Sequence, residues 1–255
     1  MELKKFEKEY RVHVYETGPD GKLNLFSLFN YLQDIASEHA VKLGFGRDDL
    51  MKQNHFWVLS RIYAEISELP LWKDNLIVKT WPRGTDKMFA IRDYEVCFPD
   101  GRVIASATSS WLIIDSTSRR IQRPDNTLTT YNSELQFTTS LPRNAAKLEP
   151  ARANEQTNSV FKVKISDLDI NMHTNNVRYL KWVMDSYDLG FVMGNVPYSA
   201  EINYLAESHY NETINIRFSE EIANGRIYNH SIIRTSDNTE LCRIRIGWKE
   251  NGVTL

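Results

Sequence analysis

The feature that most constrains the fold is a strand pattern that recurs at an interval of 137 residues. An Asp100-Gly101 turn stands eleven residues before Trp111, and an Asp237-Asn238 turn stands eleven residues before Trp248. Turn dipeptides of this kind, placed between alternating apolar residues, predict β-hairpins. A chain of 255 residues is therefore expected to fold as two related halves, because a repeated pattern predicts a repeated structural unit.

Each half also carries one long helix pattern ahead of its main strands. Apolar residues recur at helical spacing over residues 23–46, where Asn24 or Ser27 can cap the start and Gly44 can end the helix. The second helix is expected over residues 175–190, with Gly190 as its C-cap. Several strands with one dominant helix per half favour an α+β fold, in which each antiparallel sheet wraps round its helix.

Polar residues and prolines separate the two halves. We predict an N-terminal domain over residues 1–125, a linker over 126–158 and a C-terminal domain over 159–255. A connection this long and this polar is unsuited to the core and is expected to run over the surface.

Charge and cysteine content exclude several classes of protein. The 31 basic and 33 acidic residues leave a net charge of −2, so no overall field favours nucleic acid. The two cysteines, Cys97 and Cys242, are too few for a disulfide scaffold and are expected to be buried free thiols. Neither an apolar signal core nor a membrane-spanning run is visible, so we expect a cytoplasmic protein.

The stretch DLDINMHTNNVRYLKW, residues 167–182, has polar side chains at every second position before an apolar, helix-like run. Its opening resembles an EF-hand loop. However, the sixth position is Met172, where a sharp turn needs Gly, and the twelfth is Arg178, where calcium needs a Glu. Zinc needs further His or Cys at ligand spacing, which the neighbouring sequence lacks. We therefore predict neither a metal nor a cofactor.

Two other interpretations of this stretch remain. Thr174 or Asn175 can cap the following helix, which explains only part of the polar set. If the segment is extended or loop-like, Asp169, Asn171 and His173 point the same way, beside the free N–H groups of a helix N-terminus. A carboxylate, an amide and an imidazole in that position predict an acyl-transfer site.

The same stretch closely resembles the D-L-D-x-N-x-H-x-N-N-x-x-Y-x-x-W segment of the acyl-acyl carrier protein (acyl-ACP) thioesterases of plastids and bacteria. Three further segments resemble the family in the same order along most of the chain. They are KTWPRGTDKMFAIRDYEV, ATSSWLIIDSTSRRIQRP and EINYLAES. The resemblance implies a tandem hotdog fold, in agreement with the repeat.

The resemblance also implies which residues are catalytic. The family's Asp, Asn and His fall on Asp169, Asn171 and His173, and its downstream Glu falls on Glu207. The Cys that often follows that Glu is Ser208 here, so a thiol mechanism has no nucleophile at this place. We expect Glu207 to activate water, Asn171 to hold the thioester carbonyl or the water, and His173 to orient and shuttle the proton. Asp169 is expected to orient His173 or, as a less favoured role, to attack directly, and Ser208 is a less favoured nucleophile.

The sequence offers apolar candidates for binding the acyl chain and basic candidates for binding the carrier protein. By resemblance the acyl chain lies in the N-terminal half, where Phe29, Leu32 and Trp57 are candidates; ordinary core packing is the alternative. Arg119 and Arg120, with Arg123, Lys87 and Arg92 near them, are candidates for docking the acidic carrier protein; a solvated surface is the alternative.

The expected function is hydrolysis of fatty acyl-ACP thioesters to free fatty acid and carrier protein, which ends chain elongation in fatty acid biosynthesis. The expected partner is an acyl carrier protein with a phosphopantetheine-linked chain, and a homodimer is left open. Three alternatives also stay open: a hotdog thioesterase acting on acyl-coenzyme A, a hotdog enoyl-thioester hydratase, and a non-catalytic acyl-binding protein.

Overall fold

The computed structural model describes residues 5–124, 138–151, 159–223 and 225–252. The chain divides into two compact units, Met1–Ala145 and Ala146–Leu255. The division falls inside the segment 126–158, for which a linker is predicted.

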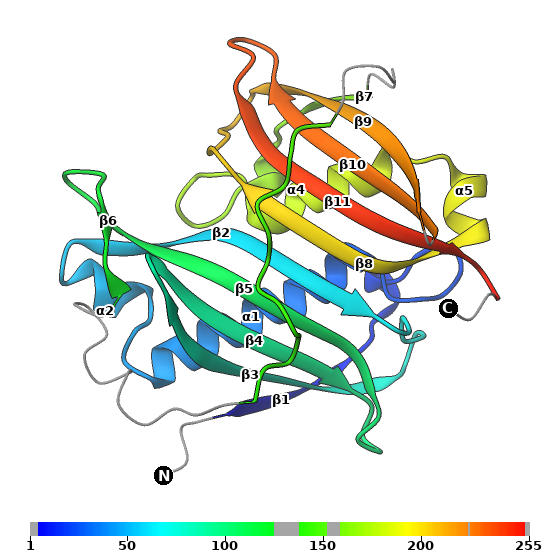
Figure 1. The fold of residues 1–255 in the computed structure, drawn as a ribbon, viewed down its shortest axis with the longest axis horizontal. Coiled ribbons are helices and arrows are strands. Elements are labelled where there is room, and N and C mark those ends of the chain that lie inside the picture. The colour runs from blue at the N-terminus through cyan, green and yellow to red at the C-terminus, as the bar shows by residue number, and fades with distance from the viewer. Residues whose placement is uncertain (1–4, 125–137, 152–158, 224, 253–255) are drawn as a thin grey trace. The chain divides into compact units, whose positions relative to one another are not determined.

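Unit 1 is an antiparallel sheet with the strand order β1-β3-β4-β5-β2, and a short strand β6 pairs with β5. The helices α1 and α2 precede β2 in the chain, and α1 lies against the sheet (Figure 1). The elements are β1 (Phe6–Arg11), the 3-10 turn η1 (Val14–Glu16), α1 (Leu25–Lys42), α2 (Arg47–Met51), β2 (His55–Ile66), β3 (Asn75–Asp86), β4 (Phe89–Cys97), β5 (Val103–Asp115) and β6 (Ile121–Gln122).

The first predicted helix is confirmed as α1. It begins after Asn24, which occupies the N-cap position without a side-chain cap bond. It ends before Gly44, whose φ of +75° lets the chain reverse, so that the N–H of Phe45 donates to the Ala40 carbonyl at 2.9 Å. The apolar stripe of α1 is buried, as its spacing predicts: Leu25, Leu28, Phe29, Leu32, Ile35 and Ala36.

Unit 2 repeats this plan with the strand order β8-β11-β10-β9-β7, all antiparallel. Its main helix, α4, is likewise followed by a shorter one, α5, and the strands (Figure 1). The elements are β7 (Ser159–Lys162), the 3-10 turn η2 (Ile165–Asp167), α4 (Asn176–Asp185), α5 (Leu189–Gly194), β8 (Asn195–Tyr204), β9 (Thr213–Ala223), β10 (Gly225–Arg234) and β11 (Glu240–Glu250).

The prediction that Gly190 ends the second helix is wrong. The helix α4 ends at Asp185, and Gly190 lies inside α5. The reason is a second N-cap: the carboxylate of Asp188 accepts hydrogen bonds from the N–H groups of Gly190 (2.8 Å) and Phe191 (3.3 Å), which starts a new helix.

Both predicted hairpin turns are present. Gly101 connects β4 to β5 at a φ of +89°, and Asn238 connects β10 to β11 at a φ of +58°. Since both units pair their strands in this way and carry one main helix, the α+β double hotdog architecture is confirmed.

The chain approaches the main helix of each unit through the same turn. Residues 14–24 and 165–175 each begin with a 3-10 turn and end at the helix N-cap. Gly21 has a φ of +74° and Met172, at the matching place, a φ of +64°. A backbone hydrogen bond closes each turn, at 2.9 Å in unit 1 and 2.8 Å in unit 2. The turn is therefore a feature of the fold that occurs twice.

Burial of a histidine in unit 2 predicts a pH dependence of stability. Removal from water lowers the pKa of His230 to about 4. Its Nδ1–H donates to the Ile244 carbonyl (3.1 Å), and its Nε2 lies 3.0 Å from the Tyr187 hydroxyl. In the unfolded chain a histidine titrates near pH 6.5. Between these values only the unfolded state binds the proton, so stability falls as the pH decreases from 6.5 to 4.

We expect this single group to contribute a slope of up to about 1.4 kcal/mol per pH unit in that window. Urea unfolding of the wild type and of His230→Gln at pH 4.5, 5.5 and 7 measures the contribution. His230→Gln should be less stable than wild type at pH 7 and should lose less stability on acidification. The exposed His13→Gln is the matched control; equal slopes in all three proteins would contradict the assignment.

Candidate active site

Asp169 organises the turn that carries the predicted catalytic residues. Its Oδ1 accepts hydrogen bonds from two backbone N–H groups, those of Asn171 (2.8 Å) and His173 (3.1 Å). The chain reverses here, with Met172 at positive φ. We expected this segment to be either extended or loop-like, and it is loop-like.

A second segment, around residues 207–209, is joined to this turn by backbone pairing. The N–H of Thr174 donates to the Ser208 carbonyl at 2.9 Å, and His173 forms an isolated β-bridge with His209. The pairing brings residues after β8 against residues before α4, although they are more than thirty positions apart in the chain. Glu207 is placed beside His173 as a result.

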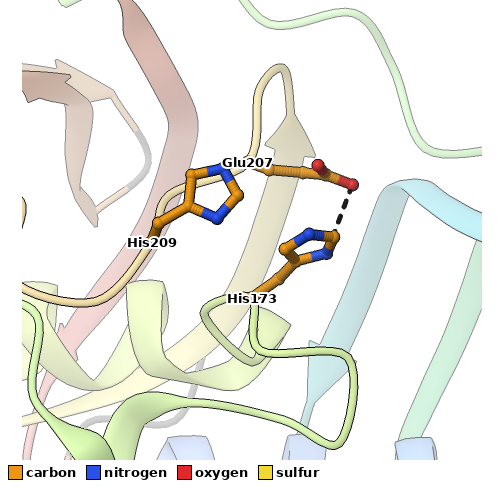
Figure 2. A group of neighbouring side chains, drawn as sticks. All are labelled: His173, Glu207 and His209. Atoms are coloured by element: carbon orange, nitrogen blue, oxygen red, sulfur yellow. Dashed lines mark ion pairs between the residues drawn. The ribbon is translucent and has the colours of Figure 1, made fainter.

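The imidazole of His173 and the carboxylate of Glu207 form the centre of the candidate site. His173 Nδ1 lies 3.5 Å from Glu207 Oε1, and the two side chains are 31% and 46% exposed, so both contact each other and solvent. Figure 2 shows the His173 ring facing the Glu207 carboxylate, with His209 beside them. The Nδ2 of Asn171 lies 3.4 Å from Asp169 Oδ2 on the same turn. The structure therefore brings His173 and Glu207 together as side chains, while Asp169 contacts the backbone of His173 rather than its ring and Asn171 contacts Asp169.

His209 is a neighbour that the sequence reasoning missed. Its ring meets the His173 ring edge to face at a centroid distance of 5.1 Å. Polar atoms of His173, Glu207 and His209 all lie within 4.8 Å of one another. The sequence does contain a signal for His209. It lies two positions after Glu207, and in an extended segment residues two positions apart point to the same side.

Ser208 points the other way and is fully buried. Its hydroxyl donates to Thr174 Oγ1 at 2.7 Å and lies 2.9 Å from the Tyr179 hydroxyl. These contacts attach the segment to α4 and leave Ser208 facing the core, away from solvent. Cys97 and Cys242 are buried and free, as predicted, and burial raises the pKa of each thiol.

Other polar residues of the stretch are structural. Asn175 is the N-cap of α4, since its Oδ1 accepts from the Val177 N–H at 2.9 Å. Asp167 Oδ2 accepts from the Lys164 N–H at 2.8 Å and so closes the 3-10 turn η2. Capping and the candidate chemistry are therefore carried by different residues.

The predicted substrate contacts lie in unit 1. Phe29 and Leu32 are buried on α1. Trp57 is partly buried on β2, where its Nε1 donates to the Phe45 carbonyl at 2.8 Å. These three positions suit both core packing and an apolar chain, and their role stays a prediction.

The basic residues considered for docking separate into two groups. Arg119 and Arg120 are exposed after β5, and the Arg119 guanidinium lies 5.5 Å from the centre of the Phe56 ring. Arg92 is buried instead, with Nη1 at 3.0 Å from His39 Nδ1 and 3.2 Å from Thr80 Oγ1. Including Arg92 in a docking surface was therefore wrong, because its side chain points into the core.

No helix in the described part of the chain combines the length and apolarity that crossing a membrane requires.

Comparison with known proteins identifies the family of this chain. The protein-family model of the acyl-ACP thioesterase N-terminal domain matches residues 3–131, and the family model of the C-terminal domain matches residues 150–250. The palmitoyl-acyl carrier protein thioesterase of Gossypium hirsutum, a chloroplastic protein, is 26% identical over 96% of this chain. The chloroplastic oleoyl-acyl carrier protein thioesterase of Coriandrum sativum is 25% identical over 85% of it. The chain spans 63% of the length of each of these two relatives.

Solved structures share the fold. An acyl-ACP thioesterase from Bacteroides thetaiotaomicron superposes with a TM-score of 0.86 at 24% identity, covering 98% of this chain and 100% of that one. The 12:0-ACP thioesterase from Umbellularia californica gives a TM-score of 0.84 at 20% identity, covering 98% and 99%. With both domain models matched in order, this chain belongs to the acyl-ACP thioesterase family.

Proposed function

We propose that this protein hydrolyses fatty acyl-ACP thioesters to a free fatty acid and the carrier thiol. The observation that carries the proposal is the His173–Glu207 pair, at 3.5 Å and open to solvent, within the family's C-terminal domain. A carboxylate and an imidazole at that distance can accept and pass on a proton. The two curated relatives are named as palmitoyl- and oleoyl-acyl carrier protein thioesterases, which supports the substrate class.

In the proposed reaction, water is the nucleophile. Glu207 takes a proton from water as the oxygen attacks the thioester carbonyl. Glu207 passes this proton to His173, whose Nδ1 lies 3.5 Å from Glu207 Oε1. The carbon–sulfur bond then breaks, and His173 delivers the proton to the departing sulfur. The products are the carboxylic acid and the free thiol, so one water is consumed. Ser208 has no part in this scheme, because its hydroxyl is buried and bonded to Thr174.

Asn171 and Asp169 support the reaction in different ways. Asn171 is exposed on the turn, and its amide supplies the polar contact for the thioester carbonyl; one such donor contributes roughly 3 to 4 kcal/mol. Asp169 positions His173 by holding the backbone N–H groups of the turn. Thioesters are already activated, which reduces the barrier that these contributions have to lower.

The acyl chain is proposed to bind in unit 1 beside Phe29, Leu32 and Trp57, with Arg119 and Arg120 contacting the carrier protein. Release of the acyl chain from its carrier would end chain elongation in fatty acid biosynthesis. A cytoplasmic location and a homodimer stay predictions.

The function is tested by incubating the purified protein with a panel of acyl-ACP and acyl-coenzyme A thioesters. Mass spectrometry identifies the released acids, and a thiol reagent counts the released carrier. We expect free acid and thiol in equal amounts, with faster turnover of acyl-ACP. Loss of an enoyl thioester without thiol release would instead indicate a hydratase, and binding without any product would indicate an acyl-binding protein.

The roles of the central pair predict that His173→Ala and Glu207→Gln each reduce turnover by about 10² to 10⁴, because proton transfer in the transition state is lost. Both side chains are partly exposed, so circular dichroism and melting temperature should stay close to wild type. The exposed His13→Ala serves as the control and should keep full turnover. Near-wild-type activity in either folded variant would refute the assignment.

Burial of Ser208 predicts a different outcome for Ser208→Ala. The variant removes a hydroxyl bonded to Thr174 and Tyr179, so the free energy of unfolding should fall by about 1 to 3 kcal/mol. Turnover per folded molecule should remain within a few fold of wild type. Stability comes from urea unfolding and turnover from the acyl-ACP assay; a loss as large as that of Glu207→Gln would mean that Ser208 takes part in the chemistry.

A further inference from the structure

We propose that His173, Glu207 and His209 form a chelating site for a divalent cation of the zinc type, which inhibits the enzyme by binding its proton-transfer groups. The three side chains hold their ligand atoms within 4.8 Å of one another (Figure 2). Binding of the ion concerns these side chains alone, whereas inhibition rests on the proposed hydrolytic function.

The distances suit a small tetrahedral ion. Zinc bonds to imidazole nitrogen and carboxylate oxygen are about 2.0 to 2.2 Å long, so neighbouring ligand atoms lie about 3.4 Å apart. His173 Nδ1 and Glu207 Oε1 already stand at 3.5 Å. The remaining separations are at most 4.8 Å, and rotation of the exposed His209 side chain can shorten them.

The backbone holds the three ligands in place. The Asp169 carboxylate fixes the amide of His173, and the β-bridge joins His173 to His209. Glu207 and His209 alternate around the buried Ser208, so both project to the side away from the core. The segment is also tied at Glu207, whose carbonyl accepts from Arg234 Nη2 at 2.6 Å. A chelate gains affinity from such preorganisation.

Local charge is compatible with a bound cation. Arg234 is the basic group attached to this segment, and carboxylates of Glu212 and Asp237 pair with it, each at 3.0 Å. The matching turn of unit 1 offers an internal comparison: there the bridge joins Lys22 to Leu71. The same backbone therefore exists in unit 1 with an ammonium and an apolar side chain at the bridge, where unit 2 has two imidazoles.

The ligand set selects the class of metal. Two imidazole nitrogens and one carboxylate oxygen suit Zn²⁺, Co²⁺, Ni²⁺ or Cu²⁺, whereas Ca²⁺ and Mg²⁺ prefer all-oxygen sites. The sequence argument against zinc considered only neighbouring residues, whereas His209 follows His173 by 36 positions. Only the pairing of the two segments brings these rings together.

The proposed consequence is inhibition. An ion bonded to Glu207 Oε1 and His173 Nδ1 occupies the lone pairs with which Glu207 accepts the proton of water and His173 receives it in turn. The carboxylate can no longer act as the base, and the imidazole can no longer share the proton. Removal of the ion by a chelator restores both groups, so the effect is reversible.

Binding is tested first, without substrate. Tag-free protein is treated with EDTA, dialysed and titrated with ZnCl₂ in a non-coordinating buffer by calorimetry. We expect one ion per chain, and an affinity weakened by more than about tenfold in His209→Ala and in Glu207→Gln, because a ligand is lost. His13→Ala, an exposed histidine elsewhere, should bind as wild type does. Absence of stoichiometric binding, or equal binding by His209→Ala, would overturn the site.

Inhibition is tested separately with the acyl-ACP assay. Turnover of the wild type should fall as ZnCl₂ fills the site, with a midpoint equal to the calorimetric dissociation constant, and EDTA should restore it. Activation by zinc, or binding without any effect on turnover, would overturn the inhibitory role. If the metal-free protein hydrolyses no thioester, the proposed function fails, while calorimetry still decides whether the metal site exists.

Discussion

The pairing of residues 173–174 with residues 208–209 is the contact on which the site depends. The β-bridge between His173 and His209, with its backbone hydrogen bond from the Thr174 N–H to the Ser208 carbonyl, joins two segments that are distant in the chain. Below them the hydroxyls of Thr174, Ser208 and Tyr179 form a buried chain of hydrogen bonds. Buried hydroxyls are costly unless they are bonded, so this chain holds the segments in a single register. The register determines that Glu207 faces His173.

The duplicated turn shows how the chemistry is added to a structural element. Both units reverse the chain before their main helix, with a residue at positive φ and a closing backbone bond. In unit 1 the positive φ belongs to Gly21, which adopts it without strain. In unit 2 it belongs to Met172, for which this conformation is less favourable. The two backbone bonds accepted by Asp169 compensate for this strain and keep His173 in place.

Ser208 and His209 illustrate how a backbone register assigns roles to neighbouring residues. Successive residues of an extended segment point to opposite sides, so Ser208 enters the core while Glu207 and His209 face solvent. The serine that takes the place of the family's frequent cysteine therefore stabilises the fold. The histidine beside it enlarges the polar cluster, and the proposed metal sensitivity follows from that position.

The sequence by itself determined the two-unit plan, both hairpin turns and the extent of α1, and it supplied the four residues proposed for the site. These are local patterns or a matched motif, and their physical basis is short-range: apolar spacing, cap residues and turn dipeptides. The end of α4 was misjudged because Asp188 starts a new helix before Gly190, a competition between caps that spacing alone does not resolve. Only the tertiary structure decided that Arg92 is buried, that Ser208 faces the core and that His209 meets His173. Each of these depends on which side of a strand faces the helix, or on contacts between residues far apart in the chain, and neither is encoded in the local pattern.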